Sequence, residues 1–287
     1  MADRAFTTLA EGGGFFEGPR WHDGRWWVSD FYERTVTAIE PGGGREVVLT
    51  VEGQPSGLGW RPDGSLLVNS MKDRRVLRRA GDGTVEEVAD LSGVAAVGGY
   101  LNDMVVDAAG RAYVGNFGFD LMGGEPLSDT ALVRVDPDGS VTVAAEGLSF
   151  PNGTVITPDG STLVVGETTG GRLTAFTVAG GGALVDRRVW AEVPGTSPDG
   201  CTLDAEGRIW AADALGNRLV RVAEGGEIVD EVPAPEGLGF YACMLGGDDG
   251  RTLLVCAAPD FFERNRSVAR EAVLLTTTVD VGHAGLP

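Results

Sequence analysis

The sequence predicts an all-β protein, a six-bladed β-propeller with four-stranded blades around a central channel, on three observations. First, the 287 residues include 45 Gly and 14 Pro, and this excess indicates many tight turns rather than long helices. Second, a short turn ending in Gly precedes an alternating, strand-like run six times. Third, these turns recur about every 40 to 50 residues, which is the period of propeller blades.

Each repeat supplies four strands in the same order. The segment before the turn forms the innermost strand, and the run after the turn, such as RWWVSD (25–30), forms the second. A third and a fourth strand follow, as in TVTAIEP (35–41) and REVVLT (45–50). The turn glycines that mark the six repeats are Gly24, Gly64, Gly110, Gly160, Gly207 and Gly250.

The two ends of the chain are expected to close the ring. The segment AVLLTTTVDV (272–281) has the pattern of a strand and is expected to pair with AFTTLAEG (5–12), which removes an exposed sheet edge. The whole chain, 1–287, is therefore expected to form a single propeller domain. A β-sandwich is the alternative, but it does not explain six regular turn markers.

The charge, the apolar runs and the cysteine content of the chain disfavour several classes of partner. The chain has 23 basic and 42 acidic residues, a formal charge of −19, which disfavours binding to nucleic acid and to anionic membranes. No run of 18 apolar residues occurs, and residues 1–16 lack a basic start followed by an apolar stretch, so neither a transmembrane span nor a secretory signal is expected. Three unclustered cysteines predict no disulfide framework and favour a cytoplasmic location. The expected partner is a small-molecule substrate, and the oligomeric state is not predicted.

One position is shared by all six repeats. Counted back from the turn glycine, it opens the innermost strand, so the six residues are expected to form a ring at one mouth of the channel. Four of the six carry carboxylate or amide oxygen atoms. The ring residues are Glu17, Ser56, Asn102, Asn152, Asp199 and Ala242.

The oxygen-bearing ring residues indicate a site for one divalent metal ion. Two carboxylates and two amides with no His or Cys are ligands for a hard cation, so Ca²⁺ is favoured and Mg²⁺, Mn²⁺ and Zn²⁺ are alternatives. The chain has only two histidines, His22 and His283, which disfavours a His-based triad or a zinc protease. The competing interpretation is that the ring residues only cap strands around a water-filled channel, because Asn and Asp before Gly commonly form turns.

Four motifs give the chain a resemblance to the regucalcin/gluconolactonase family of senescence-marker-protein type, which is related to the diisopropylfluorophosphatases. The resemblance implies a six-bladed propeller with one catalytic metal ion in the channel and lactonase activity. It also implies that Glu17, Asn152 and Asp199 bind the metal, that Asn102 contacts the metal or the substrate, and that Asp199 is the general base. The motifs are FFEGPRW (15–21), YLNDMVVDAAGRAYVGN (100–116), SFPNGTVITPDG (149–160) and TSPDGCTLDAEGRIWAAD (196–213).

The chain departs from the family where the substrate would bind. Sugar-lactonase members commonly have Arg two residues before the Asn, whereas this chain has Tyr100, which argues against gluconolactone as the substrate. Two long loops, 116–129 and 260–271, are expected to overhang the metal mouth with aromatic and Met side chains. The expected substrate-binding residues are Tyr100, Asn102, Asp103, Phe119 and Met122.

Together these features predict a metal-dependent hydrolase that opens a lactone less polar than gluconolactone. A phosphotriester or fluorophosphate hydrolase, or a metal-assisted isomerase or cyclase, is the alternative on the same site. A propeller that only binds a metal or a protein is less favoured, because the ring of oxygen atoms lies inside a channel rather than on a contact surface.

Overall fold

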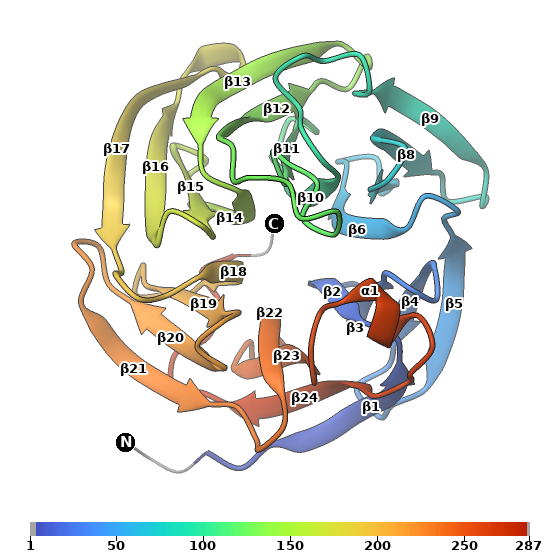
Figure 1. The fold of residues 1–287 in the computed structure, drawn as a ribbon, viewed down its shortest axis with the longest axis vertical. Coiled ribbons are helices and arrows are strands. Elements are labelled where there is room, and N and C mark those ends of the chain that lie inside the picture. Colours follow the sequence, from blue (N-terminus) through green and yellow to red (C-terminus); the bar gives the residue numbers. More distant parts are fainter. Residues whose placement is uncertain (1–3, 286–287) are drawn as a thin grey trace.

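The computed structural model describes residues 4–285 and confirms the all-β, six-bladed propeller. Six antiparallel four-stranded sheets surround a central channel (Figure 1). The helical elements within residues 4–285 are one short α-helix, α1 (Glu263–Arg266), and one 3₁₀ turn (Gly180–Gly182).

Successive strands of a blade run from the channel to the outside. The first blade consists of β2 (Phe16–His22), β3 (Arg25–Asp30), β4 (Thr35–Ile39) and β5 (Arg45–Thr50). The second consists of β6 (Pro55–Trp60), β7 (Leu66–Ser70), β8 (Arg75–Arg79) and β9 (Val85–Asp90). The third consists of β10 (Leu101–Val106), β11 (Ala112–Asn116), β12 (Thr130–Val135) and β13 (Val141–Leu148). The next two blades consist of β14 (Pro151–Ile156), β15 (Thr162–Glu167), β16 (Arg172–Val178) and β17 (Leu184–Glu192); and β18 (Pro198–Leu203), β19 (Ile209–Asp213), β20 (Arg218–Val222) and β21 (Ile228–Pro233).

The sixth blade is built from both ends of the chain, as expected. Its strands are β22 (Gly239–Gly246), β23 (Thr252–Ala258), β24 (Ala272–Thr278) and the N-terminal β1 (Thr7–Gly13). β1 pairs with β24 in antiparallel register, from Thr7 opposite Thr276 to Gly13 opposite Ala272. This pairing joins the first and last strands and closes the ring.

The six turn glycines adopt the backbone conformation that the sequence pattern requires. All of them lie in the left-handed region, with φ between 71° and 80°. A side chain at such a position is strained, whereas Gly adopts it freely. Each glycine therefore turns an innermost strand into the second strand of its blade.

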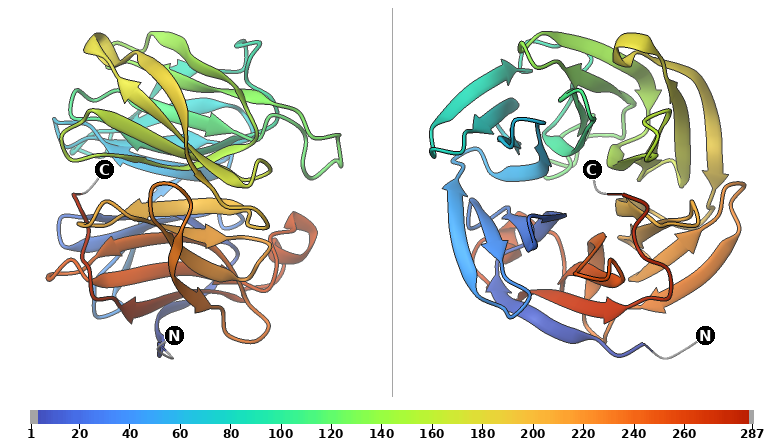
Figure 2. Two further views of the ribbon diagram at one scale, coloured as in Figure 1. Left: turned by 90° about the vertical axis from the view of Figure 1, so that its left-hand side faces the viewer. Right: turned by 180° about the vertical axis from the view of Figure 1, so that it is seen from behind.

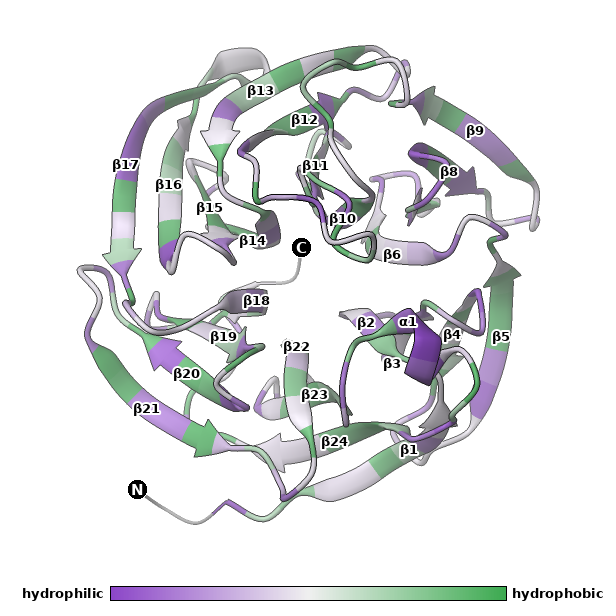
Figure 3. Ribbon diagram, viewed as in Figure 1, coloured by the Kyte–Doolittle hydropathy of each residue, from purple (hydrophilic) through white to green (hydrophobic). Residues whose placement is uncertain are grey.

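Burial decreases outward along each blade. The innermost strand β2 is almost entirely buried, whereas the outermost strand β5 is mostly exposed. Figure 3 shows hydrophilic residues along the outer strand β17 and more hydrophobic residues in β16, the strand that it covers. No helix in the part of the chain that the structure describes is long and apolar enough to cross a membrane.

Glycines let neighbouring innermost strands approach one another closely at the channel. A Cβ atom on Gly153 would lie 2.4 Å from the backbone oxygen of Asp199, and one on Gly57 would lie 2.4 Å from the backbone nitrogen of Met104. A Cβ on Gly200 would meet the next blade equally closely. These three glycines each follow a ring residue, so the close approach draws the ring side chains together at one end of the channel.

Candidate metal and substrate site

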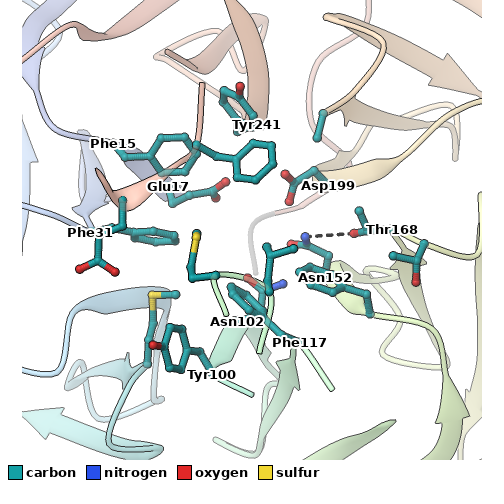
Figure 4. A pocket seen from close by; sticks show the side chains of 18 of the residues that line it. Phe15, Glu17, Phe31, Tyr100, Asn102, Phe117, Asn152, Thr168, Asp199 and Tyr241 are labelled. Carbon is teal, nitrogen blue, oxygen red and sulfur yellow. Dashed lines mark hydrogen bonds between the residues drawn. The ribbon is translucent and has the colours of Figure 1, made fainter. Parts of the chain in front are cut away.

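The structure brings the four ring residues with carboxylate or amide side chains together at one end, the floor, of a cavity of about 350 Å³. Glu17 lies on β2, Asn102 on β10, Asn152 on β14 and Asp199 on β18, and their side chains converge across the channel (Figure 4). The remaining two ring positions, Ser56 and Ala242, are buried and do not line the cavity.

Within the part of the chain that the structure describes, the two carboxylates of the floor lack a cationic partner. Glu17 is 8% exposed and accepts one hydrogen bond, from the backbone nitrogen of Gly18 at 2.9 Å. Among residues 4–285, neither Glu17 nor Asp199 forms an ion pair with Lys, Arg or His. Burial, together with the charge of Asp199, raises the pKa of Glu17 well above its usual value. Burial and the nearby Asp103 also raise the pKa of Asp199.

The two amides present their oxygen atoms to the same space. The Nδ2 atom of Asn152 donates to Oγ1 of Thr168 at 3.1 Å, and the Thr168 hydroxyl donates to the backbone oxygen of Pro198 at 2.7 Å. Nδ2 of Asn102 donates to the backbone oxygen of Pro151 at 3.5 Å. Because protein acceptors occupy both amide nitrogens, the two Oδ1 atoms are left for a ligand.

This donor set fits a hard divalent cation. It offers two carboxylates and two neutral amide oxygens, and the two negative charges balance one divalent ion. Among the described residues, no group of three or more His, Cys, Asp and Glu side chains assembles a metal site, so the fit depends on the two amides. A cation here would also compensate the buried carboxylate charge that no protein group compensates.

A second ring of cavity residues occupies a repeat position that was not recognised from the sequence, although Phe117 lies in the loop 116–129 that was expected to overhang the mouth. Five residues that directly follow the second strand of a blade line the cavity above the floor. The backbone nitrogen of each donates to the residue two positions before a ring residue, for example Phe31 to Phe15 and Phe117 to Tyr100. The signal that would have found them is their distance after the turn glycine, which is seven residues in four blades and eight at Thr168. The five residues are Phe31, Met71, Phe117, Thr168 and Ala214.

Four of the five expected substrate-binding residues line the cavity. Tyr100, Asn102, Phe119 and Met122 do so. Asp103 lies outside the lining, because its Oδ1 atom accepts from Nη2 of Arg20 at 2.7 Å and from the backbone nitrogen of Met104 at 2.8 Å. The structure therefore places Asp103 in a buried ion pair rather than in the cavity.

Both long loops overhang this mouth, as expected. Phe119, Leu121 and Met122 come from the loop between β11 and β12, and Phe261 comes from the loop between β23 and β24. Figure 2 shows this loop of the third blade and α1 at one end of the propeller, with the C-terminal segment at the other. The loops therefore extend the cavity walls away from the floor.

The cavity walls are mainly aromatic. Phe117 stacks on Phe150 with ring centroids 4.7 Å apart, and Phe15 packs against Tyr241 at 4.8 Å. At the start of β2, Phe15 lines the cavity, whereas its neighbour Phe16 does not. Arg266, in the overhanging loop 260–271, lies outside the lining and pairs with Glu271 at 2.8 Å.

Comparison with known proteins agrees with these features. Residues 15–259 match the model of the SMP-30/gluconolactonase/LRE-like region. A pentonolactonase of Haloferax volcanii is 30% identical over 250 residues, which cover 84% of this chain and 81% of that protein.

Solved structures show the same fold. The calcium-binding protein regucalcin of Agrobacterium tumefaciens superposes with a TM-score of 0.81 at 21% identity, covering 99% of this chain and 97% of that one. A gluconolactonase of Xanthomonas campestris superposes with a TM-score of 0.75 at 24% identity, covering 100% and 91%. On the match that spans most of its length, the chain belongs to the SMP-30/gluconolactonase/LRE-like family.

Proposed function

We propose that this protein is a divalent-metal-dependent hydrolase that opens a lactone, with Ca²⁺ as the favoured ion. The observation that carries the proposal is the pair of carboxylates formed by the buried Glu17 and the half-buried Asp199, which has no ion-pair partner among residues 4–285 and lies beside two free amide oxygens. The similarity to a pentonolactonase supports lactone chemistry, and the similarity to a calcium-binding regucalcin supports the ion.

The ring residues have distinct roles in this proposal. Glu17, Asn152 and Asp199, with Asn102 beside them, would hold the ion, which supplies polarisation of the ester carbonyl and stabilises negative charge on its oxygen. One carboxylate oxygen of Asp199 accepts a proton from the attacking water. The Asn102 amide contacts the substrate, and the aromatic walls exclude bulk water from the floor.

The lactone is expected to be less polar than gluconolactone. Tyr100 lines the cavity two residues before Asn102 and offers a ring face and one hydroxyl instead of the forked donors of an arginine. The apolar side chains of the two overhanging loops extend the same environment toward the mouth.

Metal analysis followed by titration of released acid tests the proposal. The purified protein is assayed on aliphatic, aromatic and sugar lactones, and on phosphotriesters, with and without a chelator. Acid release from lactones that stops with the chelator and returns with one divalent cation is the expected result. Turnover of phosphotriesters alone would assign the site to the alternative hydrolase. Absence of a bound metal and of activity on every ester would leave a binding propeller.

A further inference from the structure

We propose that the substrate is an uncharged lactone whose ring carries an apolar substituent, and that lactones bearing an anionic group are excluded. This inference rests on the proposed function and adds the substrate class. Two features of the cavity carry it: the absence of an available cation in the described lining, and the scarcity of free hydrogen-bonding groups on the walls.

The first feature is the charge balance of the cavity. The lining, as far as the described residues go, contains Glu17, Asp199 and Glu263 and no Lys, Arg or His. The nearby cation Lys72 lies over the Tyr100 ring, 5.8 Å from its centroid. Its Nζ atom is bound by both carboxylate oxygens of Glu263, at 2.7 and 2.9 Å.

This balance leaves no cation among the described lining residues to pair with a negatively charged group on the substrate. A divalent ion would neutralise Glu17 and Asp199, and Lys72 already neutralises Glu263. A carboxylate, sulfonate or phosphate on the substrate would therefore enter an apolar cavity without a partner, which is strongly unfavourable. A neutral substrate avoids this cost.

The second feature is that several polar groups of the wall and rim already donate hydrogen bonds to protein acceptors. The Tyr32 hydroxyl donates to the backbone oxygen of Phe261 at 2.8 Å, and Nε2 of Gln54 donates to Glu263 at 3.3 Å. The Thr168 hydroxyl is likewise used. A lactone with several hydroxyl groups would lose its hydrogen bonds to water on entering this cavity and would find too few protein groups to replace them.

The aromatic walls provide the complementary attraction. The Phe117–Phe150 stack and the Phe15–Tyr241 pair offer ring faces above the floor. A bare lactone ring would fill only part of a cavity of about 350 Å³. An alkyl or aryl group on the ring would fill the remainder and be removed from water.

A matched set of γ-lactones tests the inference. The members carry no substituent, a hexyl or phenyl group, several hydroxyls, or a carboxylate. We expect kcat/KM to rise about 10-fold or more from the bare ring to the apolar members, and the carboxylate member to fall about 100-fold below them, because it buries an unpaired charge. A preference for the polyhydroxylated or carboxylate member would overturn the inference.

A variant of the rim ion pair tests the charge argument directly. Glu263→Gln frees Lys72, so the ratio of kcat/KM for the carboxylate member to that for the hexyl member should rise about tenfold. Glu271→Gln removes a carboxylate from the same loop, where it pairs with Arg266 outside the cavity, and should leave the ratio unchanged. An unchanged ratio in Glu263→Gln would contradict the charge argument.

Binding of lactams separates this inference from the proposed function. Lactams with the same substituents resist hydrolysis, so calorimetry measures recognition without turnover. Tighter binding of the hexyl or phenyl lactam with no hydrolysis of any lactone would uphold the substrate class and overturn the proposed function. Hydrolysis that favours sugar lactones would uphold the function and overturn the substrate class.

Discussion

Two rings of acidic and amide side chains lie one strand apart and differ in what they bind. The inner ring opens the innermost strands and contains Glu17, Asn102, Asn152 and Asp199. The outer ring ends the second strands and contains the residues Asp30, Asn116, Glu167 and Asp213. Strand pairing sets them side by side, since the residue before Asp199, Pro198, lies opposite Asp213.

Donors within the protein satisfy the outer ring. Asp213 accepts from the backbone nitrogens of Ser197 at 2.9 Å and Gly216 at 3.1 Å and pairs with Arg218 at 2.9 Å. Burial alone would raise the pKa of Glu167, but hydrogen bonds, above all those of Arg172, hold it below its usual value. These side chains tie the loop entering a blade to its second strand.

The inner-ring carboxylates have no ion-pair partner among residues 4–285, and burial, together with repulsion from neighbouring carboxylates, raises their pKa values. The same residue types are therefore structural where the protein supplies donors and available for a ligand where it does not. Burial of a carboxylate identifies neither role by itself. The hydrogen-bond and ion-pair partners of the carboxylate determine whether it is structural or available for a ligand.

The largest effect is expected from Asp199→Asn, which removes the proposed general base. kcat/KM should fall about 10³-fold, because the attacking water loses its proton acceptor, while the circular dichroism spectrum of the folded protein is retained. The measurement is acid release from the best lactone at saturating metal. A rate close to that of the wild type would contradict the role of Asp199.

The matched change in the outer ring, Asp213→Asn, is expected to act on stability instead. It removes a buried charge that Arg218 and two backbone nitrogens contact. The free energy of unfolding should fall by about 1–3 kcal/mol, as measured by urea denaturation. Metal binding should persist in the folded variant, and its loss would remove the distinction between the rings.

A smaller effect, on metal affinity, is expected at Thr168, which follows Glu167 of the outer ring and contacts the inner ring. Its hydroxyl accepts from Asn152 and donates to the residue before Asp199. Thr168→Val should weaken metal affinity about tenfold, because the Asn152 oxygen is no longer oriented. Thr168→Ser keeps the hydroxyl and should restore affinity in calorimetric titrations. Equal affinity of the Val and Ser variants would show that the hydroxyl does not position Asn152.

The repeat explains why so much of the floor could be predicted from sequence. The offset from the turn glycine selects one ring of residues despite their separation along the chain: Asn102, Asn152 and Asp199 lie eight residues before it, and Glu17 lies seven before it, because the first turn is one residue shorter. The pairing of the terminal strands was equally accessible, because both segments alternate like the strands between them.

Side-chain direction next to the ring was harder to predict. Every innermost strand has a register irregularity at or beside its ring residue, as between Glu17 and Arg20 and between Leu101 and Met104. Simple alternation does not hold across such irregularities. This is why neither Asp103 nor Phe16 lines the cavity.

Contacts of the rim could not be read from sequence at all. Lys72 and Glu263 are 191 residues apart and belong to no shared repeat position. Their pairing follows from the closed ring, which places the sixth blade next to the first. The overhanging loop of the sixth blade passes over the first blade and reaches the second.

Calorimetric titration of the metal-free protein with Ca²⁺ tests the central claim, that the inner ring binds one divalent ion. The wild type and Asp213→Asn should each bind one ion per chain, and Glu17→Gln should lose this binding, because one of two charged ligands is removed. No binding by the wild type to Ca²⁺ or to another divalent cation, or undiminished binding by Glu17→Gln, would contradict the claim.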